Sequence, residues 1–229
     1  SIDAFVAIDD GAQSRLLTWH DGVHSQSLAS GYLPVHQVER WHKAEQVSLT
    51  VASCAHLIGP EQYADSAIYA RYTVKNHGSE RRKGSLHLAL RPLQVNPPWQ
   101  FLNIPGGFTP VYELSVAPTR DALDGSVVAP SGGASAQSSS DRLVLAGDQL
   151  TQPGMRGGRF ALKLSPPADR AGVTTFGAGD VVRHLRQCSV PQAQTVSDKR
   201  GMASALMVYD FDLEPGAEYV VTLALPYSD

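Results

Sequence analysis

The sequence predicts an all-β fold in which two antiparallel sheets pack face to face and one short helix accompanies them. Three observations lead to this fold class. Apolar and polar residues alternate with a period of two over many segments, as in strands with one face in a core and one face in solvent. Gly, Pro, Asn and Asp cluster between these segments, where turns are expected. Helical periodicity is confined to one short segment.

The alternating segments have bounds that can be read directly from the chain. In residues 204–213, Tyr209 and Phe211 fall on the apolar face. Asp210 and Asp212 fall on the opposite face, which we expect to meet solvent. The predicted strands are residues 46–59, 66–76, 84–93, 159–165, 204–213 and 218–225.

Turn residues mark the connections between strands. Residues 75–84 and residues 212–219, the latter with Pro215-Gly216, are predicted to be hairpin connections because each separates two alternating segments. Asp-Gly pairs in "DDGAQ" and "HDGVH" predict turns on either side of residues 14–19.

The predicted helix follows Gly179. Asp180 is the expected N-cap, Val181 and Leu185 share one face, and Pro191 ends the segment. Residues 130–141, "PSGGASAQSSSD", consist almost entirely of small polar residues and are predicted to be a flexible loop inside the domain.

Composition limits the classes of function. The chain has 229 residues with a formal net charge of -3 and a pI of about 6.2, which argues against nucleic acid or an anionic membrane as a partner. No apolar run approaches the roughly 20 residues of a membrane span. Cys54 and Cys188 are expected to be free thiols. We expect residues 1–229 to form a single domain and, since both ends look cut, to be a fragment of a longer chain; the compartment stays open.

The most unusual segment is residues 91–107, "RPLQVNPPWQFLNIPGG". Its prolines favour extended geometry, which lowers the entropy cost of holding nearby side chains in place. An aromatic ring can stack on the apolar face of a sugar, and amides and a guanidinium can form hydrogen bonds with its hydroxyl groups. Alternatively, the amides satisfy the loop's own backbone while the aromatic rings fill the core. The residues predicted to contact carbohydrate or another domain are Arg91, Gln94, Asn96, Trp99, Gln100 and Asn103.

Other constellations carry weaker signals. The pairs His20 with His24, and His36 with His42, lack a regular ligand spacing, so we expect no metal site. Asp210 and Asp212 would stand about 7 Å apart on one strand face. That separation suits inverting glycosidases. Any Asp-Phe-Asp in a strand gives it, however, so we expect two like charges on a solvated face. No nucleophile or phosphate-loop motif is present. We therefore expect no catalytic residue and no cofactor in this chain.

Two long segments resemble a known family. They are "YARYTVKNHGSERRKGSLHLALRPLQVNPPWQFLN" and "MVYDFDLEPGAEYVVTLALP". Both are similar to the β-rich domain of large bacterial glycoside hydrolases that also carry a coagulation factor 5/8 type (discoidin) domain. In that family a galactose-mutarotase-like supersandwich precedes an (α/α)6 barrel, as in cellobiose-phosphorylase-like and glucoamylase-like enzymes. "RPLQVNPPWQFLN" is the most specific part of the resemblance.

The resemblance implies a role within a larger enzyme. Catalytic carboxylates would lie in the downstream (α/α)6 domain of the same polypeptide, which this chain does not contain, and residues 91–107 would shape its sugar cleft. The chain would then be a non-catalytic domain of a glycoside hydrolase or phosphorylase, with an oligosaccharide as a further partner. Two alternatives remain: an independent carbohydrate-binding module, and an aldose-epimerase-like enzyme or lyase on the same fold. No motif here matches the catalytic His and Glu of mutarotases.

Overall fold

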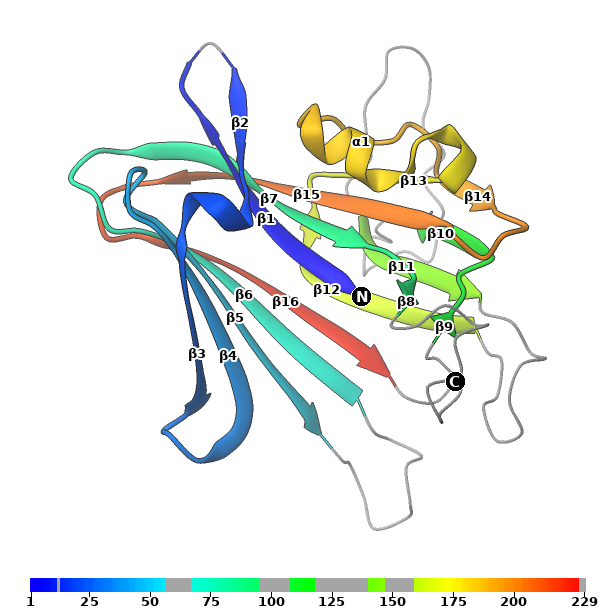
Figure 1. The fold of residues 1–229 in the computed structure, drawn as a ribbon, viewed down its shortest axis with the longest axis horizontal. Coiled ribbons are helices and arrows are strands. Elements are labelled where there is room, and N and C mark those ends of the chain that lie inside the picture. The colour runs from blue at the N-terminus through cyan, green and yellow to red at the C-terminus, as the bar shows by residue number, and fades with distance from the viewer. Residues whose placement is uncertain (12, 57–66, 95–107, 118–139, 147–158, 227–229) are drawn as a thin grey trace, which may run out of the picture.

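The computed structural model of residues 1–229 describes the chain except for residues 12, 57–66, 95–107, 118–139, 147–158 and 227–229 (Figure 1). The described residues form two antiparallel sheets of nine and five strands, a small two-stranded sheet and one short α-helix. This confirms the predicted all-β sandwich.

The five-stranded sheet is built around β7, β15 and β1, which pair over most of their lengths. Its edge strand β2 pairs only with the second half of β1, from Val6 to Asp9, so the first half of β1 has a free edge. In spatial order the sheet contains β13 (Arg170–Thr174), β15 (Ser204–Leu213), β7 (Arg82–Leu90), β1 (Ile2–Asp9) and β2 (Ser14–Leu17).

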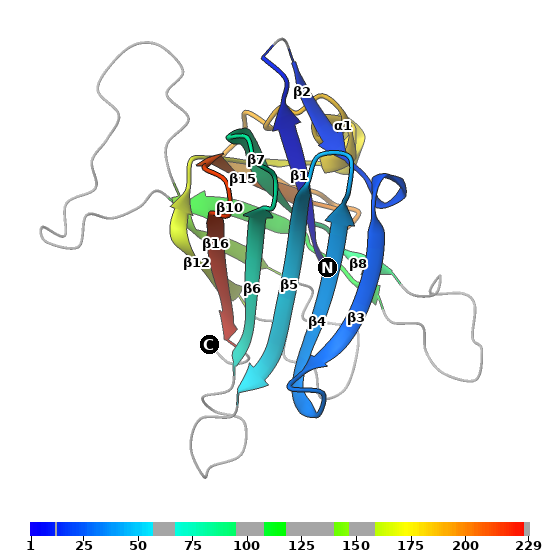
Figure 2. The ribbon, with the colours of Figure 1, turned by 90° about the vertical axis from the view of Figure 1, so that its left-hand side faces the viewer.

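The nine-stranded sheet is wider and ends in two hairpin-linked strands, β4 and β3. In spatial order it contains β14 (Thr195–Ser197), β10 (Glu113–Ala117), β11 (Ser140–Ala146), β12 (Arg159–Ala168), β16 (Glu218–Pro226), β6 (Ala67–Asn76), β5 (Val47–His56), β4 (Leu33–His42) and β3 (Val23–Ala29). The small sheet pairs β8 (Leu93–Gln94) with β9 (Phe108–Thr109). Figure 2 shows β3 to β6 and β16 side by side in this order.

The two predicted hairpins are wrong. β6 belongs to the nine-stranded sheet and β7 to the five-stranded sheet, so residues 75–84 cross from one sheet to the other. The connection from β15 to β16 crosses in the same way, and both crossings lie at the same end of the sandwich (Figure 1). Turn residues reverse the chain, but they do not determine whether the next strand pairs with the previous one or crosses the core. The Asp-Gly turn after β1 does close a hairpin, since β1 pairs with β2.

The core lies between the sheets and follows the predicted alternation. Tyr209 and Phe211 are buried in it from β15, as expected. Its largest fully buried side chains are Leu17, Leu49, Leu86, Leu88, Leu114, Leu162, Met207 and Tyr209.

A second apolar cluster forms on the outer side of the five-stranded sheet, beneath α1 (Asp180–Arg186), as Figure 1 shows. Val181 and Leu185 of the helix pack on Leu206 and Val208 of β15. Parts of β7 and β15 are therefore buried on both faces, and His87, which was expected on a solvent face, is buried. Period-two alternation cannot reveal that another element covers the polar side of a strand.

The helix starts at a different residue from the one predicted. Gly179 is the N-cap, and Asp180 is the first helical residue, with a φ of 57°. The Asp180 carboxylate accepts hydrogen bonds from the Val181 N–H and from the Ser204 hydroxyl, which fastens the helix to β15.

Three remaining expectations concern loops, thiols and membranes. Of residues 130–141, the first ten lie outside the described residues, and Ser140 already begins β11. Cys54 and Cys188 are both free. Across the described part of the chain, no helix has the length and hydropathy needed to cross a membrane.

Candidate functional site

The nine-stranded sheet extends beyond the five-stranded sheet, and the inner side of β3 and the first half of β4 is left open. Gln26 and Leu28 of β3, and His36 of β4, are exposed although they point to the side that forms the core elsewhere. The register shows this orientation, because Arg40 pairs with the buried core residue Leu49. We call this surface the β3–β4 face; it consists of Trp19, His24, Gln26, His36 and Arg40.

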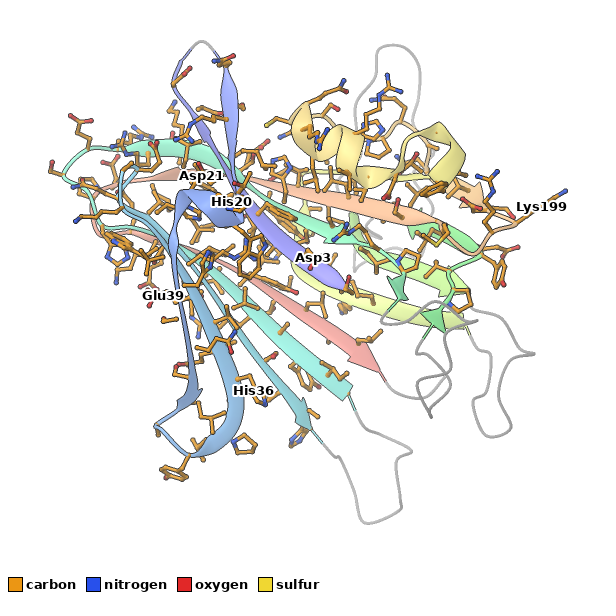
Figure 3. All side chains as sticks on the ribbon, in the orientation of Figure 1. Asp3, His20, Asp21, His36, Glu39 and Lys199 are labelled. Atoms are coloured by element: carbon orange, nitrogen blue, oxygen red, sulfur yellow. The ribbon has the colours of Figure 1, made fainter. Side chains whose placement is uncertain are left out.

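Cross-strand pairs between β3 and β4 show how the residues of this face are arranged. His24 stands opposite Arg40, and Leu28 stands opposite His36, with Gln26 between them opposite Val38. Figure 3 labels His36 and Glu39 on β4. Because side chains alternate along a strand, Glu39 points to the other side of the sheet and is not part of the face.

Trp19 reaches this face from the crossing between the sheets. The one-turn 3-10 helix η1 (Trp19–Asp21) links β2 to β3, and Figure 3 shows His20 and Asp21 on this crossing. The Asp21 carboxylate accepts hydrogen bonds from the Thr18 N–H at 2.6 Å and from the Thr18 hydroxyl at 2.7 Å. Hydrogen bonds from the Thr18 hydroxyl and backbone lower the pKa of Asp21, so the carboxylate stays charged and the cap stays closed.

A buried histidine anchors η1 to the sheet. His42 is buried on β4, and its Nδ1 lies 3.3 Å from the backbone carbonyl of Asp21. Burial lowers the pKa of His42, so the ring is neutral at pH 7 and can donate to that carbonyl. Gly22 packs closely beside it, because a Cβ there would lie 3.0 Å from the Trp41 carbonyl oxygen.

The indole of Trp19 lies flat on the sheet. Its ring stacks on His24 with a centroid distance of 4.5 Å and an interplanar angle of 26°, and His24 Nε2 lies 2.7 Å from the Trp19 carbonyl oxygen. The Arg40 Cζ lies 4.1 Å from the Trp19 ring centroid. His24 and Arg40 are cross-strand neighbours on one side of the sheet, and both contact the indole. Trp19 nevertheless remains 49% exposed.

Arg40 is a buried cation beneath this ring. It is 5% exposed, and its Cζ also lies 5.7 Å from the Phe5 ring centroid. Its Nη1 is buried and has no hydrogen-bond partner in the part of the chain that the structure describes. Burial lowers the pKa of Arg40, although a guanidinium remains protonated at neutral pH.

The structure describes one predicted site residue in full. The Arg91 guanidinium donates to the Asp3 carboxylate at 2.6 Å, and the Arg91 N–H donates to the Ser1 carbonyl. The backbone of Gln94 pairs with Phe108 in the small sheet. The other predicted residues, Asn96, Trp99, Gln100 and Asn103, lie outside the described residues, so their role stays a prediction.

The acidic pair on β15 is held in ion pairs on the surface. Asp210 lies 2.5 Å from Arg170, and Asp212 lies 2.8 Å from Arg81. The sequence allowed two interpretations of this pair, catalytic carboxylates or charges on a solvated face. The ion pairs favour charges on a solvated face. Among the described residues, no three His, Cys, Asp or Glu side chains are grouped to hold a metal ion.

Trp19 and Arg40 were not predicted from the sequence. Residues 33–42 show no apolar alternation, because the phase that faces the core holds, besides Val38, the polar residues His36, Arg40 and His42. The sequence pattern therefore gave no indication that Arg40 is buried. Trp19 directly precedes the predicted turn at Asp21-Gly22, which was interpreted only as a connection.

Comparisons with known proteins find only a weak likeness to solved structures. No protein-family model matches the chain, and no curated protein matches it. A solved structure of a polysaccharide lyase aligns with a TM-score of 0.44 and 11% identity, over 97% of this chain and 25% of that protein. The chain thus spans about a quarter of the length of the lyase it matches.

Proposed function

We propose that this chain is a non-catalytic β-sandwich domain of a carbohydrate-active protein, and that its β3–β4 face binds a sugar chain. One observation carries the proposal: the indole of Trp19 is held by contacts with His24 and Arg40 and is still 49% exposed. Carbohydrates use their C–H faces to stack on such rings and their hydroxyls to bond nearby polar groups.

The arrangement suits sugar binding because the ring is already in place. The η1 cap and the contacts beneath Trp19 hold the side chain before any ligand arrives, which reduces the entropy lost on binding. Gln26 and His36 continue the same face away from Trp19 and are exposed. An amide and an imidazole can each donate to and accept from hydroxyl groups, so an extended sugar chain would find polar partners beyond the stacking site.

The proposed context is a larger enzyme in which a downstream (α/α)6 domain supplies the catalytic carboxylates. In support, the ion pair between Arg91 and Asp3 fixes the start of the segment 91–107 to β1. That segment would then approach the neighbouring domain or its sugar from a rigid base. The proposal predicts that the isolated chain has neither glycosidase nor phosphorylase activity. Such activity would favour an enzyme on the same fold.

Binding is tested by isothermal titration of the chain with a panel of oligosaccharides, comparing the parent protein with Trp19→Ala. We expect at least one oligosaccharide to bind and Trp19→Ala to weaken its binding about tenfold or more, as expected for loss of a stacking ring. Tyr69→Ala is the matched control, because Tyr69 is an exposed aromatic residue on the other side of the same sheet. The proposal fails if nothing binds or if both variants bind equally well.

A further inference from the structure

Arg40 is a buried cation whose charge is not matched in its surroundings. Among the described residues Nη1 has no hydrogen-bond partner, and the guanidinium lies near the rings of Trp19 and Phe5. Aromatic faces stabilise a cation only in part, and a guanidinium removed from water is best satisfied by a carboxylate, sulfate or phosphate group that accepts two hydrogen bonds.

The nearest carboxylates already have other partners. Asp3 Oδ2 accepts from Arg91 Nη2 at 2.6 Å, so two guanidinium groups, those of Arg40 and Arg91, share the field of one carboxylate. Asp21 is occupied by the Thr18 cap and lies 3.8 Å from Arg15. Glu39 follows the opposite phase of β4 and points to the other side of the sheet. Around Arg40, the described residues thus leave an excess of positive charge.

We propose that the sugar bound on the β3–β4 face carries an acidic group, a carboxylate or a sulfate, and that this group pairs with Arg40. The inference rests on the proposed sugar-binding function and adds the chemical class of the ligand. Trp19 is half exposed, and an acidic group would reach the guanidinium beside the indole by a rotation of the Arg40 side chain, while the stack of Trp19 on His24 stays in place. The sugar ring then stacks on Trp19 while its acidic group reaches the cation at the edge of the indole.

The test is a titration series with three probes of matched length: a neutral cello-oligosaccharide, an oligogalacturonate and a sulfated oligosaccharide. We expect one or both acidic probes to bind at least tenfold more tightly than the neutral probe at 50 mM salt. This advantage should shrink at 500 mM salt, since added ions screen the charge pair. Preference for the oligogalacturonate or for the sulfated probe identifies which acidic group is recognised.

Variants assign the effect to Arg40. Arg40→Gln should remove the acidic advantage, and Arg40→Lys should keep part of it. Arg71→Gln, an exposed cation that follows the outward phase of β6, should leave the advantage unchanged. If Arg40→Gln does not fold, the salt dependence and the acidic-to-neutral ratio of the parent protein decide the question.

The outcomes separate the two proposals. Equal binding of neutral and acidic probes, with the Trp19→Ala effect intact, overturns only the acidic ligand. Persistence of the acidic preference in Arg40→Gln also overturns it. Absence of binding to every probe overturns the sugar-binding function together with this inference.

Discussion

The side-chain amide of Asn76 donates a hydrogen bond of 3.0 Å to the backbone carbonyl of Leu213, joining the two connections that cross between the sheets. The same amide donates to the Glu80 carbonyl, and its oxygen accepts from the Gly78 N–H. The Asn76 backbone bonds Ala217 and Gly216. Asn76 is fully buried, and it provides hydrogen-bond partners for backbone groups of both connections at the end of the sandwich where the sheets are linked.

Replacing this residue should be costly. Asn76→Ala leaves buried carbonyl and N–H groups without partners, and each such group costs about 1–3 kcal/mol. We expect the free energy of unfolding, measured by urea denaturation, to fall by roughly 3 kcal/mol. Lys75→Gln is the control. It removes an exposed ion pair with Glu218, which solvent screens, so little or no loss of stability is expected. Similar losses for both variants would show that Asn76 does not hold the crossings together.

His87 should make stability depend on pH. The ring is 1% exposed, its Nε2 is joined to the Ser85 hydroxyl by a hydrogen bond of 2.9 Å, and burial lowers its pKa to about 4. The unfolded chain takes up a proton on this ring near pH 6.5, whereas the folded chain does so only near pH 4. Stability from the neutral ring is therefore present above pH 6.5 and is lost as the pH falls toward 4.

The size of this effect is roughly 2–3 kcal/mol between pH 7.5 and pH 4.5. His87→Gln should lose correspondingly less stability over that range than the parent protein, because glutamine does not titrate. Urea unfolding of both proteins at the two pH values measures how much the free energy of unfolding changes with pH. The carboxylates contribute equally to both proteins, so the difference between the two changes reports His87. Parallel pH profiles would mean that His87 is not buried as a neutral ring.

Gly172 should not tolerate a side chain. It lies in the middle of β13, and a Cβ there would stand 1.8 Å from the Pro191 carbonyl oxygen. Because this neighbour is backbone, the strand or the segment after α1 must move. We expect Gly172→Ala to lower the free energy of unfolding by about 3 kcal/mol or more. Gly177→Ala is the matched control, since nothing lies within 4 Å of its Cβ position. Thermal unfolding of both variants is the measurement. Equal melting temperatures would contradict the prediction.

The packing of α1 can be tested at Leu185. This buried side chain belongs to the apolar cluster that covers β15. Truncation to alanine leaves a cavity and should lower the free energy of unfolding by about 2–4 kcal/mol. Arg186→Ala, on the exposed side of the helix, should change stability by less than about 0.5 kcal/mol. Chemical denaturation of both variants is the measurement. A small loss for Leu185→Ala would indicate that the helix contributes little to holding the sheet.

Local pattern predicted the strands but not their partners. The alternation in residues 204–213 correctly placed Tyr209 and Phe211 in the core, because the side to which a residue points depends only on the pleat of its own strand. Whether β15 then pairs with β16 or crosses to the other sheet depends on contacts with strands far away in sequence. Pro215-Gly216 is compatible with both, so the hairpin prediction was wrong.

The candidate site likewise contains one part that the sequence indicated and one part that it did not. Residues 91–107 stood out because of their composition, and their role stays a prediction. The β3–β4 face could not be foreseen, since Trp19 and Arg40 are brought together by a crossing between sheets and by the exposure of β3 beyond the smaller sheet.

By itself, the sequence determined that this protein is a sandwich of antiparallel strands, and which side chains of the predicted strands face its core, because a period of two is a local property of the backbone. Only the tertiary structure decided which strands cross between sheets, that α1 covers the outer side of β15, and that an indole rests on a buried guanidinium. These features depend on contacts between segments distant in sequence, which no short pattern records.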